Sequence, residues 1–259
     1  MKSPSFALVT GASQGLGKVF AQALAARKQN VILVARSRDK LENLAHELRG
    51  STGVFAEVLE FDLASPSAGS HLAQQLLDRE FQVNLVVNNA GFGIRGEFAK
   101  LPLRRQIEMI CLNNVAIVEL THSLLPSLMN HIPAGIINVS SAAGFQPIPY
   151  ASLYAATKSF LTSFSLGLAE ELRSHGVSVV TLCPGRLLAG THRGEAENAN
   201  RRFGFVYQSP EVVVRAALES LARGGGLVVP GLVNKFSVFA QRLIPRRTVP
   251  RLVARMSRQ

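Results

Sequence analysis

The chain turns at TGASQGLG, residues 10–17, directly after the apolar run FALV at residues 6–9. Glycine tolerates positive φ and lets a backbone approach closely, and a phosphate is favoured at the N-terminus of a helix. A glycine-rich turn alone is weak evidence, but this one lies between a strand-like run and a helix-like segment, the context that a dinucleotide pyrophosphate requires. The stretch therefore predicts a strand, a phosphate-binding turn and a helix.

Short apolar runs alternate with longer amphipathic segments along the rest of the chain. The runs are apolar nearly throughout, as in a parallel sheet buried on both faces, and lie at 6–10, 31–35, 54–59, 84–87, 135–139, 177–182 and 227–229. The helix-like segments lie at 15–28, 38–49, 66–80, 102–130, 151–175 and 209–222, the last with Ser209 as cap and Pro210 in its first turn. We expect a single-domain α/β fold: a doubly wound, Rossmann-type parallel sheet of seven strands with helices on both faces.

Composition narrows the class of protein. With 259 residues, 47% of them hydrophobic and 17% charged, the chain suits one domain with a large core and excludes global disorder. Cys111 and Cys183 lie in apolar surroundings, so we expect buried, inert thiols in a reducing compartment, and the six histidines show no metal-ligand spacing. Residues 1–5 are too short for a signal peptide and no apolar run approaches the ~18 residues of a membrane span. These features predict a cytoplasmic protein, at most peripheral to a membrane, with no metal site.

The positive charge is concentrated at the C-terminal end. The formal net charge is +11, and residues 235–259 carry seven Lys or Arg and no Asp or Glu. The rest is only mildly basic, which argues against a nucleic-acid partner. Apolar residues recur at roughly helical spacing around 235–244 and 251–258, and Pro245 and Pro250 are expected to break the segment. Two interpretations stay open: this tail packs on the body or on a second subunit, or it binds anionic lipid peripherally.

The sequence thus divides into a catalytic domain over residues 1–233 and a basic amphipathic tail over 234–259. Within the domain, residues 186–208 are polar and strandless and interrupt the alternation. A long irregular insertion of this kind is more often a binding lid than a spacer, so we expect it to cover the substrate.

Tyr154 and Lys158 are the first candidate pair for chemistry. Their i,i+4 spacing on a helix places both side chains on one face. A phenol with a pKa of ~10 is a poor base at neutral pH, but a nearby ammonium favours the phenolate. The pair can then donate or accept a proton at a carbonyl or alcohol oxygen. A surface tyrosine and lysine one turn apart would show the same spacing.

Six motifs occur in the order and spacing of the short-chain dehydrogenases/reductases, and the chain resembles that family over about residues 6–230. They are Thr10-Gly11-x3-Gly15-x-Gly17, Asn88-Asn89-Ala90-Gly91, Asn113, Ser141, Tyr154-x3-Lys158 and Pro184-Gly185. Within the family the chain is similar to bacterial members of unassigned substrate. The resemblance implies a NAD(P) cofactor, a small carbonyl or alcohol substrate of apolar character, and a homodimer or homotetramer.

The resemblance also implies roles for single residues. The catalytic set would be Asn113, Ser141, Tyr154 and Lys158, with Ser140 and Asn114 as adjacent alternatives to the serine and the asparagine. Asn113 would help to hold a water near the lysine, and Ser141 would hydrogen-bond the substrate oxygen. The cofactor would contact Gly11, Ser13, Gln14, Gly15, Leu16, Gly17, Asp62, Leu63, Asn89, Ala90, Gly91, Tyr154, Lys158, Pro184 and Gly185. An ordinary loop aspartate is the alternative for Asp62, as an ordinary turn is for the asparagine motif.

One position departs from the family pattern. Members often carry threonine four residues after the glycine of Pro-Gly, where it contacts the nicotinamide carboxamide, but here that position is Ala189. Thr191 follows two residues later. We expect the loop to shift so that Thr191 reaches the carboxamide; backbone groups are the alternative.

The end of the second strand indicates which cofactor is used. Enzymes that use NAD place an acidic residue there to bind the ribose 2′-hydroxyl. This chain reads Ala35-Arg36-Ser37-Arg38, with no acid. A guanidinium holds a 2′-phosphate, so Arg36, supported by Ser37 and Arg38, predicts NADP(H) over NAD(H). A solvated arginine at a helix start is the alternative.

Together these features predict an NADP(H)-dependent carbonyl reductase that interconverts a ketone or aldehyde and an alcohol by hydride transfer. A catalytically silent dinucleotide-binding sensor or scaffold is the alternative outside the enzymes. Within the enzymes, a 3-oxoacyl reductase and a hydroxysteroid-type dehydrogenase both fit the residues.

Overall fold

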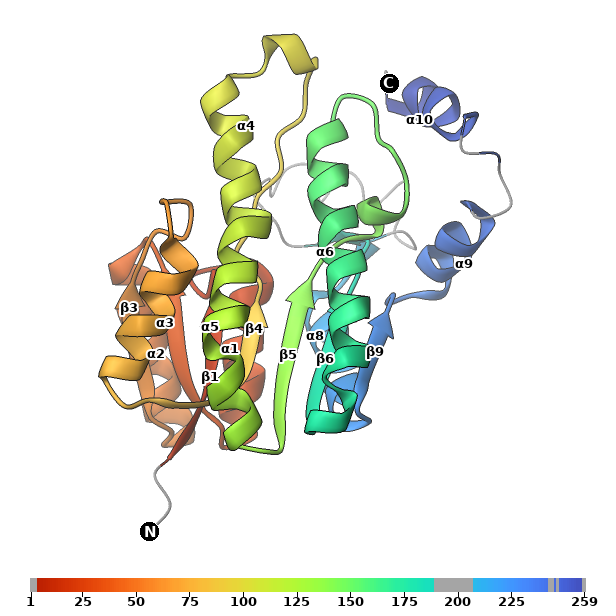
Figure 1. The fold of residues 1–259 in the computed structure, drawn as a ribbon. Coiled ribbons are helices and arrows are strands. Elements are labelled where there is room, and N and C mark those ends of the chain that lie inside the picture. Colours follow the sequence, from red (N-terminus) through yellow and green to blue (C-terminus); the bar gives the residue numbers. More distant parts are fainter. Residues whose placement is uncertain (1–3, 189–206, 242–244, 246, 258–259) are drawn as a thin grey trace.

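A parallel seven-stranded sheet forms the centre of the molecule (Figure 1). The computed structural model describes residues 4–188, 207–241, 245 and 247–257. The strands follow the order β3-β2-β1-β4-β5-β6-β9, with bounds β1 Ser5–Thr10, β2 Asn30–Ala35, β3 Ala56–Glu60, β4 Gln82–Asn88, β5 Ala134–Val139, β6 Val177–Leu182 and β9 Gly225–Val228. The order reverses between β1 and β4, where doubly wound sheets bind ligands at the carboxyl ends of their strands. The predicted fold class is confirmed.

Helices cover both faces of this sheet. One face packs on α1 (Gly15–Ala26), α2 (Arg38–Thr52) and α8 (Pro210–Ala222), and the other on α3 (Ala68–Asp78), α5 (Ala116–Asn130) and α6 (Ser152–Glu171). Successive residues of β1 serve both cores, because Ala7 and Val9 join the first cluster while Phe6 and Leu8 join the second. This two-sided burial explains why the strands read as continuous apolar runs.

The segment expected as one helix over 102–130 is interrupted. It begins with α4 (Leu103–Ile110), widens into a π-helical turn η2 (Cys111–Val115) and continues as α5. π-Helical turns are rare and frequently lie at functional sites. Among the described residues, Leu103–Asn130 is the helix whose length and mean hydropathy of 1.2 would suffice to cross a membrane. Its leucines at 120, 124 and 128 are buried against the sheet, as in a core helix.

The insertion expected to be strandless carries a short strand at each end. Arg186–Leu187 (β7) pairs in parallel with Tyr207–Gln208 (β8), and Leu188 N also donates to Gln208 O at 2.9 Å. The expectation of no strand was therefore wrong at the ends, where the backbone groups of the two short segments satisfy each other. The predicted lid between them, with Thr191, lies outside the described residues.

Local geometry corrects the boundaries near the C-terminal half. The helix expected to reach residue 175 ends at Glu171 and continues as the 3-10 turn η4 (Arg173–His175), because Gly176 takes a left-handed φ of 72°. The tail forms α9 (Leu232–Gln241) and α10 (Val249–Ser257). Pro245 lies between the two helices, but Pro250 is the second residue of α10 and does not break it, because proline fits the first turn of a helix.

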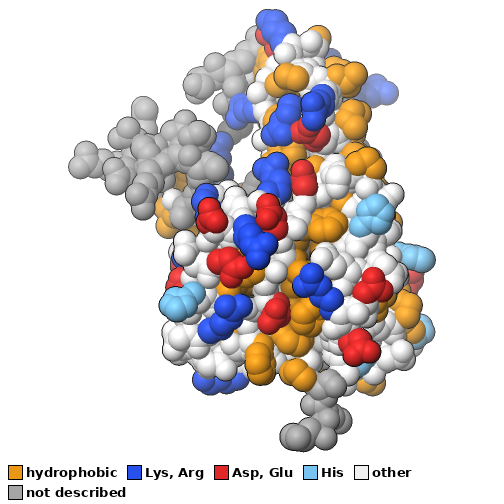
Figure 2. Space-filling model, turned by 90° about the vertical axis from the view of Figure 1, so that its left-hand side faces the viewer, with side chains coloured by type: hydrophobic (Ala, Val, Ile, Leu, Met, Phe, Trp, Pro, Cys, Tyr) orange, Lys and Arg blue, Asp and Glu red, His pale blue; other side chains and the backbone are white. Residues whose placement is uncertain are grey.

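The surface of the body mixes both signs of charge. Figure 2 shows acidic and basic side chains interleaved over the side of the molecule that carries β3. Several pairs are close enough for salt bridges, among them Lys18 with Glu47 at 3.5 Å. The described part of this face therefore shows no purely basic patch.

Candidate active site

The glycine turn after β1 is held in shape by the end of β4. Asn89 Nδ2 donates to Thr10 O at 2.8 Å and to Gly11 O at 3.3 Å. A Cβ on Gly17 would lie 2.2 Å from Gly11 O, so only glycine lets α1 start this close to the turn. Gly15, at φ +56°, faces open space with no atom within 4 Å of its Cβ position. The turn thus presents an open backbone cradle at the N-terminus of α1, which suits a phosphate group.

Thr10 is a structural member of this site that the sequence analysis did not assign. Its hydroxyl donates to Val87 O at 3.1 Å and accepts from the backbone N–H of Asn89 at 2.9 Å and of Ala90 at 3.0 Å. In the sequence, the available signal was the place of Thr10 at the end of the first apolar run, where it begins the glycine motif. Thr10 locks the ends of β1 and β4 together, so Asn89, Ala90 and the glycine turn share one edge.

The other residues that were expected to contact the cofactor follow β1, β2 and β3 at the same edge of the sheet. Ser13 and Gln14 lie in the turn, Gln14 as the exposed N-cap residue of α1, and Leu16 is buried in the core. Asp62 Oδ1 accepts from Ala64 N at 3.0 Å, which forms a local turn and leaves the carboxylate exposed, while Leu63 is buried. The last residues of β1, β2 and β3 meet there because parallel strands end together.

The basic residues after β2 point to solvent. Arg36, Ser37 and Arg38 are all exposed. Ser37 is the N-cap residue of α2 but makes no side-chain capping bond. Arg38 pairs with Glu42 at 3.6 Å, whereas Arg36 forms no salt bridge within the part of the chain that the structure describes. The Arg36 guanidinium is therefore available to an anion at this edge.

Ser141 and Tyr154 meet where β5 ends. Ser141 caps the 3-10 turn η3 (Ala142–Phe145), its Oγ accepting from Ala143 N at 3.1 Å. Burial raises the pKa of the Tyr154 phenol, and a hydrogen bond with the Ser141 side chain partly opposes that rise. The neighbouring Ser140 turns inward, donating to Lys158 O at 2.8 Å and bonding Thr162 Oγ1 at 2.7 Å. Of the two serines, Ser141 is thus the one that faces the phenol.

Lys158 is buried one turn along α6. Its Nζ donates to Val139 O at 2.8 Å, and burial lowers the pKa of the ammonium to about 8. We expected this charge to depress the phenol's pKa, but Lys158 is not among the causes that act on Tyr154. The ammonium is directed to the carbonyl of Val139, and burial keeps the proton on the phenol to higher pH than usual.

The π-helical turn places Asn113 against both the loop after β4 and α6, and Asn114 against α6. Asn113 is fully buried; its Nδ2 donates to Phe92 O at 3.0 Å and to Thr157 Oγ1 at 3.1 Å, and its Oδ1 accepts from Phe92 N at 3.1 Å. Asn114 Nδ2 donates to Thr157 O at 2.9 Å. The Asn113 side chain thus joins the loop after β4 to α6. Its Oδ1 accepts one hydrogen bond and can accept a second, so its expected role in holding a water near Lys158 stays a prediction.

Two glycines allow the site to close around Tyr154 and Lys158. A Cβ on Gly93 would lie 2.8 Å from Cδ2 of the Tyr154 ring, and one on Gly91 would lie 2.9 Å from Asn113 Oδ1 and 3.6 Å from Lys158 Nζ. Gly91 was expected from its motif, whereas Gly93 was not. Its signal was the spacing of the two glycines in Gly91-Phe92-Gly93 after the asparagine motif.

Pro184 and Gly185 follow β6 on the far side of the site. Gly185 N donates to Gln208 Oε1 at 3.2 Å, and the side chain of Asn234 leaves no room for a Cβ at Gly185. The start of α9 therefore contacts the loop in which the sequence analysis placed the nicotinamide contacts.

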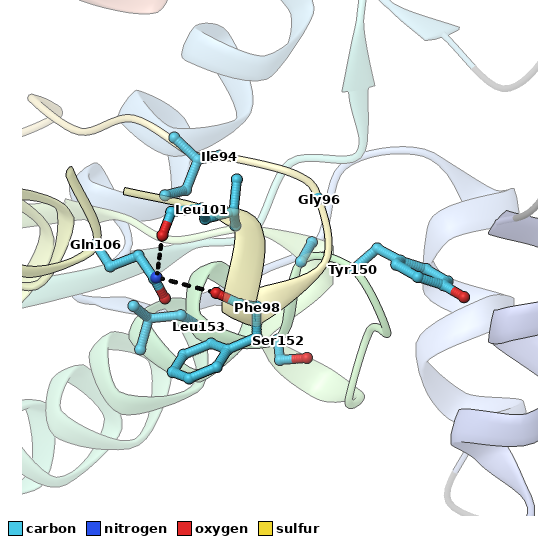
Figure 3. A pocket seen from close by; sticks show the side chains of 9 residues that line it. Ile94, Gly96, Phe98, Leu101, Gln106, Tyr150, Ser152 and Leu153 are labelled. Carbon is cyan, nitrogen blue, oxygen red and sulfur yellow. Dashed lines mark hydrogen bonds between the residues drawn. The ribbon is translucent and has the colours of Figure 1, made fainter. Parts of the chain in front are cut away.

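A small pocket opens beside the residues that precede Tyr154 (Figure 3). It has a volume of about 30 Å³ and a mainly apolar lining that includes Ile94, Phe98, Leu101 and Leu153. Gln106 reaches in from α4, donating to Phe98 O at 3.3 Å and Leu101 O at 3.1 Å, while its buried Oε1 has no hydrogen-bond partner among the described residues. Nothing in the sequence singled Gln106 out. It shapes the loop after β4 on the side of Tyr154.

Among the described residues, neither thiols nor metal ligands add to this site. Cys183 is buried and its pKa is raised by burial, as expected of an inert thiol, whereas Cys111 is only partly buried. Across the described part of the chain, no group of three or more His, Cys, Asp or Glu could hold a metal ion.

The glycine turn lies at the switch point of a doubly wound sheet. At the same edge lie a buried lysine and a tyrosine that is hydrogen-bonded to a serine. This arrangement is typical of a nucleotide-dependent oxidoreductase. The family model for short chain dehydrogenase matches residues 5–200. The chain belongs to this family of oxidoreductases.

Relatives of known name are identical to this chain at about a third of the aligned positions. It is 33% identical over 226 residues to a very-long-chain 3-oxoacyl-CoA reductase of Phaeosphaeria nodorum, covering 86% of this chain and 64% of the relative. It is 35% identical over 178 residues to the ketoacyl reductase HetN of Nostoc sp., covering 69% and 62%. The chain thus spans less than two thirds of the length of these relatives.

Solved structures agree with the fold over nearly the whole chain. One, from work on 7β-hydroxysteroid dehydrogenase stereoselectivity, has a TM-score of 0.83 and 26% identity and covers 96% of each chain. A short-chain dehydrogenase from Sphingobium yanoikuyae in complex with NADPH has a TM-score of 0.79 and 29% identity, covering 92% of this chain and 93% of that one.

Proposed function

We propose that the protein is an NADP(H)-dependent reductase that interconverts a ketone and an alcohol, with a 3-oxoacyl thioester as its substrate class. The observation that carries the proposal is the meeting of the Tyr154 phenol with Ser141 at the end of β5, with buried Lys158 one turn away. The relatives named as 3-oxoacyl-CoA and ketoacyl reductases support the substrate class.

Tyr154 acts as the acid in the direction of reduction. When bound, the cofactor supplies a hydride to the carbonyl carbon. The phenol, whose pKa is raised by burial, retains its proton until the substrate oxygen gains charge and then transfers that proton to it. Ser141 donates a hydrogen bond to the same oxygen. The Lys158 ammonium, with its pKa of about 8 and directed to Val139 O, would restore the proton of the phenolate at near-neutral pH through an intervening group such as a water.

The residues of this edge fit a dinucleotide. The open backbone over Gly15 and the N-terminus of α1 would hold the pyrophosphate, and Arg36 would hold a 2′-phosphate. Asp62 and Leu63 would contact the adenine, and Pro184 and Gly185 the nicotinamide. The contact between Thr191 and the carboxamide stays a prediction.

Two other functions are weighed against this one. A hydroxysteroid ketone as substrate is favoured by the overall similarity to the structure from the 7β-hydroxysteroid dehydrogenase work. A silent nucleotide-binding protein would need none of the tyrosine, serine and lysine arrangement, so the intact set argues against it. The homodimer or homotetramer and the cytoplasmic location also stay predictions.

Consumption of NADPH with a panel of ketones tests the proposal. The panel contains 3-oxoacyl thioesters of increasing chain length, steroid ketones and small water-soluble ketones, and Tyr154→Phe is the control at equal protein concentration. We expect turnover that is highest with the thioesters and lost in the variant. Turnover highest with steroid ketones would overturn the substrate class, and cofactor binding without turnover of any ketone would favour the silent protein.

A further inference from the structure

The helix α9 turns its most apolar side away from the protein. Leu232 is 82% exposed, Phe236 72% and Phe239 59%. Their i, i+4, i+7 spacing puts the three on one face of the helix, and Val233, 46% exposed, lies beside them. A helix of a monomeric domain normally buries this kind of face, so these four side chains, termed the α9 patch, mark a contact surface.

The opposite side of α9 fixes the helix to the body next to the active site. Val238 is only 7% exposed and packs with Cys183, Val229 and the partly buried Phe145 of η3. Asn234 donates to Pro230 O at 3.0 Å and fills the space over Gly185. The helix is thus anchored, and its outward aromatic face is not the result of a missing contact with the body.

Cations without acidic partners accompany the patch. Lys235, Arg247 and Arg251 are exposed, and within the part of the chain that the structure describes none of the three forms a salt bridge. Residues 235–259 carry seven Lys or Arg and no acid in all. Figure 1 shows α9 and α10 beyond the end of β9, at the edge of the sheet, whereas the side of the body in Figure 2 mixes both signs.

We propose that the α9 patch and the cations of the same C-terminal segment dock the protein on an anionic lipid surface. Aromatic and aliphatic side chains enter the interface of a bilayer while Lys and Arg bind its negative headgroups, and the two effects add. A second copy of the chain is the weaker occupant. A two-fold interface would set this segment against itself, with cations facing cations and no acid in either segment to offset them.

Docking here would bring the reaction site to the lipid. The same helix that carries the patch contacts the loop of Gly185 and packs on η3, the turn that Ser141 caps. An apolar acyl substrate partitioned into the bilayer would then have a short path to Tyr154. The docking itself stands on the surface of α9 and goes beyond the proposed reaction.

Vesicle flotation of the full-length protein tests the docking. The vesicles contain phosphatidylcholine alone or phosphatidylcholine mixed with phosphatidylglycerol, at low and high salt. Two variants address the two forces: Phe236→Ser/Phe239→Ser for the apolar contact and Lys235→Gln/Arg247→Gln/Arg251→Gln for the charge. Matched controls remove the same number of apolar or cationic side chains at exposed positions elsewhere: Phe55→Ser/Leu77→Ser and Arg27→Gln/Arg79→Gln/Arg223→Gln.

We expect wild type and both controls to float with the anionic vesicles, less at high salt, and not with the neutral ones. Each lost cation should weaken binding about fivefold, and each lost phenylalanine about tenfold or more. Circular dichroism and turnover of a small soluble ketone with NADPH should be unchanged in the tail variants, which separates docking from the proposed function. Equal flotation of the variants and wild type would overturn the proposal. So would a wild-type dimer in sedimentation that Phe236→Ser/Phe239→Ser converts to a monomer, because the occupant would then be a second copy.

Discussion

Replacing Arg36 with aspartate should reverse the proposed preference for NADPH over NADH. Arg36 is exposed after β2 and forms no salt bridge with any described residue, so its guanidinium is free to bind a 2′-phosphate. Arg36→Asp removes that partner and places a carboxylate where it repels the phosphate. The same carboxylate can accept a hydrogen bond from the ribose 2′-hydroxyl of NADH.

The magnitude follows from the exposure of this side chain. A hydrogen bond to a charged group contributes about 1.5–3 kcal/mol, which is about 10- to 150-fold in an equilibrium. Because Arg36 is exposed, screening by salt favours the lower end. We therefore expect kcat/KM for NADPH to fall roughly 10- to 50-fold in Arg36→Asp, while that for NADH is retained or rises.

Steady-state kinetics with both cofactors at low and high salt are the assay, and Arg38→Leu is the matched control. Arg38 already pairs with Glu42 at 3.6 Å, so its loss should change kcat/KM by only about twofold. The wild-type preference for NADPH should shrink at high salt, and so should the discrimination of Arg36→Asp against NADPH, because salt screens attraction and repulsion alike. A wild-type preference for NADH, or an Arg36→Asp variant that keeps its NADPH preference, would refute the reasoning.

Three further predictions concern the core of the site. Tyr154→Phe should lower kcat by about 100-fold or more with little change in NADPH affinity, measured by turnover and fluorescence titration; retention of a tenth of the activity would contradict a role as acid. Folding lowers the pKa of Lys158 from 10.5 to about 8, so between these values the unfolded chain binds the extra proton and the free energy of unfolding rises with pH. In urea titrations from pH 8 to 10.5, the free energy of unfolding of wild type should rise by up to roughly 3 kcal/mol relative to that of Lys158→Met. A difference that does not depend on pH would show that folding does not lower the pKa of Lys158. Asn138→Ala should lower the free energy of unfolding by about 2–4 kcal/mol, since it leaves its buried hydrogen-bond partners Asn88 and Ser165 unpaired. Asn130→Ala, at an exposed position, should lower it by under about 0.5 kcal/mol. Equal effects would show that this hydrogen-bond network does not stabilise the fold.

That last network shows what the sequence could not reveal. Asn88 on β4 donates to Asn138 Oδ1 at 2.8 Å, and Asn138 Nδ2 donates to Ser165 Oγ on α6 at 2.8 Å. Asn88 was noticed through its motif, but Asn138 lies inside an apolar strand and Ser165 inside a helix, with no local pattern to mark them. Their partners are set by the register of β4 against β5, where Asn88 and Asn138 stand opposite each other. Such pairing depends on tertiary contacts, which periodicity does not contain.

The sheet, by contrast, could be predicted because local and global signals agree. The central strands are apolar on both faces, and the helices carry an apolar stripe, so the alternation admits few architectures. The positions of Tyr154 and Lys158 on one face of α6 follow from helical spacing alone. The direction of Lys158 does not. Burial and the carbonyl of Val139 decide where its ammonium points, and both come from packing that brings β5 against α6.

The tail makes the same distinction sharper. Helical spacing of Phe236 and Phe239 predicts an apolar face on α9, but spacing cannot say whether that face turns inward or outward. The direction is set by what α9 must bury on its other side: Val238 against Cys183, and Asn234 over Gly185. Gly185 has no side chain, so Asn234 can approach the loop after β6 only with the aromatic face turned to solvent. Gly185 thus leaves space beside the active site and also allows α9 to turn its patch outward. This one glycine links the reaction site to the surface proposed to meet the lipid.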